Sequence, residues 1–91
     1  MNPRVRSVVA MPSHQLRVEF TDGQSRLLDV RPYLSYTVFR PLSNPEIFNQ
    51  AKADHGTVSW PGGIDLDPDS VYLESVPDEE GSARPSLADA A

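Results

Sequence analysis

The stretch "QLRVEFTDGQSRLLDV", residues 15–30, places two short strand-forming segments on either side of a turn signal. Apolar side chains stand at alternate positions of its first half, namely Leu16, Val18 and Phe20. This period of two puts one face of a strand in a core and the other in solvent. Asp22 and Gly23 predict a two-residue type I′ turn, in which both central residues have a positive φ. The segment "SRLLDV" then returns as the second strand of an antiparallel hairpin.

The segments on either side of this hairpin extend the prediction. Upstream, the valine-rich "RVRSVVAMP" predicts a first strand, so residues 4–30 form a three-stranded antiparallel meander with a bend at residues 12–14. Downstream, the two prolines of residues 31–42 exclude a long helix and predict a helical turn followed by an extended piece. Five apolar residues of this segment are expected to cover one end of the sheet: Tyr33, Leu34, Val38, Phe39 and Leu42.

A helix start follows in "SNPEIFNQAKAD", residues 43–54. Asn44 is the expected N-cap, Pro45 suits the first helical position, and Glu46 lies in the first turn, where the helix dipole favours an acid. The helix is expected to run on to His55 and Gly56, where glycine suits the left-handed conformation after a helix end.

The stretch "WPGGIDLDPDSVY", residues 60–72, contains three aspartates at alternate positions, Asp65, Asp67 and Asp69. An EF-hand calcium loop would need a glycine where Ser70 stands and a glutamate where Val76 stands. A helix start explains the aspartates instead, with Asp67 as N-cap before Pro68. The preceding "TVSW" predicts a later strand, and Val71 and Tyr72 are expected to turn inward.

Together these elements predict an α+β fold. The expected architecture is a small antiparallel sheet, a three-stranded meander plus one later strand, packed with one helix and a short C-terminal helix. Ninety-one residues allow one domain. We expect that domain to span residues 1–76, followed by a disordered acidic tail, residues 77–91, which lacks aromatic and β-branched residues.

Composition narrows the classes of function. The net charge of −5 argues against nucleic acid as the partner, because affinity for a phosphate backbone comes from Lys and Arg. The chain has no cysteine, which excludes disulfides and thiolate metal sites. No apolar run is long enough to span a membrane, and we expect a soluble cytoplasmic protein.

Candidate binding residues are few, and no catalytic residue, metal ligand or cofactor is expected. Trp60 is the only tryptophan and could anchor a partner, although core burial is the more common use of such a residue. Arg17 and Arg26 could form a basic patch on the polar face of the meander. The alternative is that they are ordinary surface residues balanced across strands by Glu19 and Asp29.

Residues 5–73 resemble a known family. The stretches "LRVEFTDGQSRLLDVRPYL" and "VFRPLSNPEIFNQAKADHGTVSWPGGIDLDPDSVY" are similar to the bacterial domain-of-unknown-function family 2442. The matching positions are Phe20, Asp22, Gly23, Asp29, Leu42, Pro45, Phe48, Trp60, Pro61, Gly63, Asp65, Pro68 and Tyr72. Gly62 departs from the family's usual asparagine, and Ile64 and Val71 depart from its alanine and leucine. If that asparagine binds something, Gly62 removes the contact.

The resemblance implies a compact α+β domain and no particular activity. Members occur alone, beside a helix-turn-helix segment, or encoded next to another small domain in arrangements suggestive of toxin–antitoxin pairs. The leading hypothesis is a non-enzymatic interaction module that binds a protein partner, in an antitoxin-like or regulatory role, with Trp60, Gly62, Asp65, Arg17 and Arg26 as candidate contacts.

Two alternatives come from other classes. One is a small metal-dependent hydrolase that uses the loop of Asp65 and Asp67 with a histidine. The other is a transcription-related accessory domain that binds nucleic acid through the arginine-bearing sheet face. Exposed strand edges also leave homo-oligomerisation open.

Overall fold

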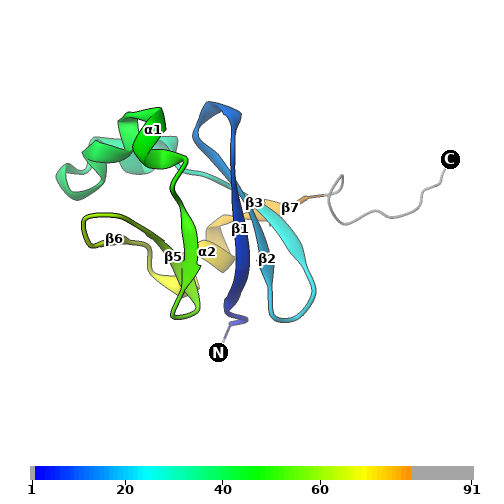
Figure 1. Cartoon of the computed structure of the whole chain (residues 1–91). Coiled ribbons are helices and arrows are strands. Elements are labelled where there is room, and N and C mark those ends of the chain that lie inside the picture. The colour runs from blue at the N-terminus through cyan, green and yellow to red at the C-terminus, as the bar shows by residue number, and fades with distance from the viewer. Residues whose placement is uncertain (1, 79–91) are drawn as a thin grey trace, which may run out of the picture.

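The computed structural model describes residues 2–78, which form two antiparallel sheets with short helices around them (Figure 1). The first sheet has the strand order β1 (Val5–Met11), β2 (Gln15–Phe20), β3 (Ser25–Asp29) and β7 (Val76–Pro77). The second has the order β4 (Lys52–Asp54), β5 (Thr57–Trp60) and β6 (Ile64–Asp65). The α+β class and the three-stranded meander are confirmed. The later strand β5, however, belongs to the second sheet and does not extend the meander.

The β2–β3 turn differs from the predicted type. Phe20 accepts a hydrogen bond from the Gly23 N–H and donates one to the carbonyl of Gln24, both at 2.9 Å. Gly23 has a φ of +89°, whereas Asp22 is not among the residues with positive φ. This is the pattern of a three-residue hairpin loop whose last residue is left-handed, and the predicted type I′ turn is wrong. The hairpin itself is confirmed.

The core contains residues from both sheets and from the helices. Its buried apolar members are Val5, Leu16, Val18, Phe20, Leu28, Val30, Leu42, Phe48, Val58, Trp60, Ile64, Leu66 and Val71. Each fully buried aliphatic or aromatic side chain contributes roughly 1.5–3 kcal/mol relative to an exposed one. The alternation predicted for β2 is confirmed, since Leu16, Val18 and Phe20 are all fully buried.

Two 3₁₀ helices, η2 (Arg31–Ser35) and η3 (Thr37–Ser43), lead from β3 to α1 (Pro45–Phe48). Of the residues expected to cover the sheet, Leu42 is fully buried, and Tyr33, Leu34 and Phe39 pack partly buried against the core. Val38 instead remains largely exposed.

The helix α1 is much shorter than predicted. Its start is as expected, because Asn44 Oδ1 accepts the Glu46 N–H at 3.0 Å. It ends at Phe48, however, and Lys52–Asp54 pair with β5. The predicted extension to Gly56 is wrong because His55 (φ 52°) and Gly56 (φ 78°) form the turn of a β-hairpin. Two positive φ values match the twist of paired strands, not a helix end.

The second helix, α2 (Pro68–Glu74), contacts one strand from each sheet, β5 and β3. Asp67 Oδ2 accepts the Ser70 N–H at 3.2 Å, which confirms the predicted N-cap. Val71 is fully buried, and the ring of Tyr72 packs edge-on against Phe20 at 5.1 Å. Among the helices of residues 2–78, none combines the length and apolar character that a membrane span requires.

The described chain ends in a short strand that returns to the meander. In β7, Val76 and Pro77 pair with Leu27 and Arg26 of β3. The next residue, Asp78, is only 2% exposed. Two residues of the expected tail, Pro77 and Asp78, thus lie against the meander. The rest of the expected acidic tail, residues 79–91, lies outside the described residues.

Candidate functional site

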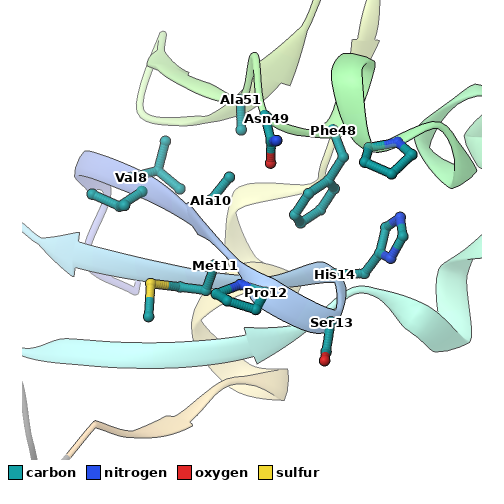
Figure 2. A pocket seen from close by; sticks show the side chains of 11 residues that line it. Val8, Ala10, Met11, Pro12, Ser13, His14, Phe48, Asn49 and Ala51 are labelled. Carbon is teal, nitrogen blue, oxygen red and sulfur yellow. The ribbon is translucent and has the colours of Figure 1, made fainter.

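A groove of about 640 Å³ lies between β1 and the segment that contains α1 (Figure 2). Residues 8–11 of β1 and the turn Pro12–His14 form one side. Pro45, Phe48, Asn49 and Ala51 form the other, which we call the wall. The volume is within the range of roughly 300–1,000 Å³ typical of ligand sites.

β1 is an edge strand, since β2 is its only partner in the described sheet. The Phe20 N–H bonds toward β3, and backbone groups alternate in direction along a strand, so Val18 and Leu16 also face β3. Val8 and Ala10 are their partners in β1. The N–H and C=O groups of these two β1 residues therefore point away from β2, along the groove.

β4 and β5 of the second sheet pack beside β1, and a backbone hydrogen bond joins the two sheets at the first residue of β1. This bond runs from the Val5 N–H to the Gly56 carbonyl, at 2.9 Å. Arg4 reinforces it with a bond of 3.1 Å from a guanidinium nitrogen to the His55 carbonyl. Within residues 2–78, the edge of β1 is thus bonded to the second sheet at Val5, and no backbone hydrogen bond to that sheet follows at Val8 or Ala10.

The wall is held from within the core. Phe48 is buried and its carbonyl accepts a hydrogen bond of 2.9 Å from Trp60 Nε1. On the other side, the His14 ring lies 4.8 Å from the Phe48 ring, and His14 Nε2 is 2.9 Å from the Leu42 carbonyl oxygen. The wall is therefore fixed to both the second sheet and the β1–β2 turn.

The groove is almost uncharged. Among the described residues that line it, His14 is the only titratable one, and one of its ring nitrogens is engaged with Leu42. The turn carrying this histidine also has an unusual backbone, because Ser13 (φ 63°) and His14 (φ 57°) are both left-handed. Such conformations cost of order 1–3 kcal/mol each in residues other than glycine.

The predicted contacts from the β5–β6 hairpin separate in space. Trp60 is only 3% exposed and is a core residue. Gly62 lies in the turn after it, with a φ of +92°, and Asp65 is exposed at the end of β6. None of the three lines the groove.

The two arginines do not form a shared patch. Arg17 is opposite Leu27, whereas Arg26 is opposite the buried Val18, so the two guanidinium groups leave opposite faces of the sheet. Arg17 Nε lies 2.5 Å from an oxygen of Asp78.

Arg26 binds the segment after α2. Its Nε and one terminal nitrogen donate to the hydroxyl and carbonyl of Ser75, at 2.7 and 2.6 Å, and its guanidinium lies 4.8 Å from the centre of the Tyr72 ring. Both arginines therefore hold the end of the described chain against the meander.

The charge balance expected across strands is also different. Glu19 pairs with Arg6 at 3.7 Å, and Asp29 pairs with Arg31 at 2.8 Å. Hydrogen bonds from Arg31 lower the pKa of Asp29 below its ordinary value.

The aspartate loop shows no convergence of ligands. Asp67 caps α2, and Asp69 Oδ1 accepts a bond of 3.4 Å from the Asn2 amide. Within residues 2–78, no three His, Asp or Glu side chains are placed to hold a metal ion together. His55 lies against Asp54 at 3.1 Å on the surface.

Tyr33 has a perturbed pKa. Its partial burial, followed by the hydrogen bond that its hydroxyl donates to Glu74, raises its pKa above the usual value. The contact joins η2 to the end of α2 and is peripheral to the groove.

The groove residues were missed because no local pattern marks them. The sequence pattern indicates only strand positions for Val8 and Ala10 and a helix position for Phe48, and the groove exists only where two distant segments meet. One signal was available: Ala10 is a small residue in the otherwise bulky strand "VVAM", which leaves space beside an edge.

The comparisons with known proteins give one match. A family model described as "Protein of unknown function (DUF2442)" matches residues 5–77. No curated protein and no solved structure matches the chain.

Proposed function

Because the chain belongs to the DUF2442 family, whose description names no activity, we propose a function from its surface: a non-enzymatic module that binds a protein partner through the β1 groove. The observation that carries the proposal is the coincidence of an open strand edge with an apolar groove. The N–H and C=O groups of Val8 and Ala10 point into this space. An edge strand of this kind is a template for another chain.

The groove is a better candidate than the contacts expected from sequence. Trp60, Arg17 and Arg26 are engaged within the fold, in the bonds to Phe48, Asp78 and Ser75. The groove instead offers a concave, nearly neutral surface between β1 and the wall. We place this module in the cytoplasm, in keeping with its lack of cysteine.

The test is a selection from a display library of short linear peptides on the immobilised full chain. Enriched peptides are then titrated by isothermal calorimetry against wild type and three variants. Asn49→Arg puts a long charged side chain at the exposed rim of the groove. Ala10→Leu puts a larger side chain on its β1 side, which reduces the space in the groove. Leu73→Arg is the control, at an exposed position of α2 outside the groove.

We expect wild type and Leu73→Arg to bind alike, and both groove variants to bind at least about tenfold more weakly with unchanged far-UV spectra. Equal binding by all four proteins, or a selection that enriches no peptide binding the folded chain, would falsify the proposal.

A further inference from the structure

We infer that the partner binds β1 as an added antiparallel or parallel strand, and that it is an extended peptide with an uncharged aliphatic side chain directed between Ala10 and Phe48. This inference rests on the proposed function, since it specifies how the groove binds and which chemistry it selects. Strand addition is a common mode of peptide recognition, in which backbone bonds supply affinity and side-chain pockets supply specificity.

The backbone part comes from the two outward residues of β1. Val8 and Ala10 each present one donor and one acceptor along the groove. Val5 is closed off by its bond to Gly56, and Pro12 has no N–H to offer. The open part of the edge therefore suits a short extended segment.

The side-chain part comes from the direction of the pleat. Val8 and Ala10 are opposite the buried Val18 and Leu16, so their side chains share the core-facing side of the sheet with the wall. A partner residue directly opposite either of them has its side chain on this same side, where it meets Phe48 and Ala51.

The partner residues in between point to the other face. There they adjoin Val9, which is 56% exposed, and remain in contact with solvent. The peptide sequence should consequently alternate. Residues directed toward the wall should be aliphatic, and the residues between them can be of almost any type. A charged residue toward the wall would lose its hydration without finding a counter-ion in the groove lining.

A separate peptide fits the edge better than a second copy of this chain. Pairing two β1 strands antiparallel would place both α1 segments on one face of the joined sheet, each over the other copy's β1. The wall of Phe48 to Ala51 already stands beside that strand. A slender extended segment avoids this conflict.

The experiment uses the peptide with the highest affinity from the selection, synthesised with single N-methyl groups placed in turn along its backbone. Each methyl removes one amide donor. We expect a periodic result: methylation at every second position weakens binding at least about tenfold, and methylation at the positions between has little effect. Replacing one aliphatic residue of the wall-facing set by aspartate should weaken binding similarly.

Three results would overturn the inference. If binding depends on the groove variants but N-methylation shows no period of two, the proposed function stands and strand addition is wrong. If aspartate is tolerated at every position, the aliphatic anchor is wrong. If the free chain dimerises and Asn49→Arg abolishes the dimer, the occupant of the edge is a second copy.

Discussion

The indole Nε1 of Trp60 donates a hydrogen bond of 2.9 Å to the carbonyl of Phe48, which fixes the groove wall from inside the core. A core residue of the second sheet thereby positions a surface formed by β1 and α1. The stability of the fold and the shape of the groove are coupled through this one contact.

Trp60→Phe should therefore weaken both the stability of the fold and the binding of a peptide in the groove. The variant leaves a buried carbonyl without its donor, which costs about 1–3 kcal/mol, and the smaller ring loses further packing. Thr57→Val is the matched control, because Thr57 Oγ1 donates to the buried carbonyl of Leu66 at 2.6 Å, away from the groove. Urea denaturation should show both variants destabilised, while calorimetry with a selected peptide shows weaker binding for Trp60→Phe only. Equal losses of affinity would argue that the bond does not shape the wall.

Gly56→Ala should destabilise the protein more than Gly23→Ala. Both glycines have a positive φ, so each substitution places alanine in a left-handed conformation at a cost of about 1–2 kcal/mol. At Gly56 the new Cβ would also lie 2.6 Å from Arg4 Nε, whereas at Gly23 nothing lies within 4 Å. Displacing Arg4 removes its bond to the His55 carbonyl. Gly23→Ala should therefore have a higher thermal unfolding temperature than Gly56→Ala. The reverse order would show that the contact with Arg4 does not matter for stability.

Arg17→Ala should cost about 1–3 kcal/mol of unfolding free energy, because it removes one partner of a carboxylate that is 2% exposed. The expected loss is limited because the Arg17 side chain is partly exposed to solvent. Arg6→Ala provides the control, since its pair with Glu19 is exposed and 3.7 Å long, and such pairs contribute about 0–1 kcal/mol. Indistinguishable effects in urea denaturation would mean that the contact with Asp78 does not anchor β7.

Stability should fall at alkaline pH because of Tyr33. Its pKa in the folded protein lies above the value of 10.0 that it has when unfolded, because of burial and the bond to Glu74. The unfolded chain therefore releases this proton first as the pH rises. The stabilisation is complete below about pH 10 and is lost as the pH rises toward the folded pKa.

Urea denaturation on either side of about pH 10 measures this loss. Tyr33→Phe should remove most of the decline, and Tyr36→Phe, at an exposed position, should retain it. If stability falls equally with pH in both variants, groups other than Tyr33 are responsible for the loss.

Sequence reasoning succeeded where the controlling contacts are local. The cap of Asn44 on Glu46 and that of Asp67 on Ser70 each join residues within one turn, and their signals stand in the sequence itself. The alternation of apolar and polar residues in β2 likewise predicts which of its side chains are buried.

It failed where distant segments decide. The sequence pattern of Lys52–Asp54 predicts a continuation of α1. These residues pair with β5 instead, because the turn at His55 and Gly56 favours a hairpin. Arg26 is a charged residue of the kind usually found at the surface. Its position opposite Val18, however, directs its side chain to Ser75 on the core-facing side of the sheet. The groove belongs to this second class, since its two sides are separated by most of the meander and the 3₁₀ segments.

Amide hydrogen exchange at Val8 and Ala10, measured by NMR on the full chain with and without a selected peptide, tests the central claim most directly. In the free protein these two amides should exchange faster than that of Val9, whose backbone groups face β2. Saturation with peptide should slow both at least about tenfold and leave Val9 little changed. If Val8 and Ala10 are already protected in the free chain, or if the peptide protects other strands instead, β1 is not the edge to which a partner adds.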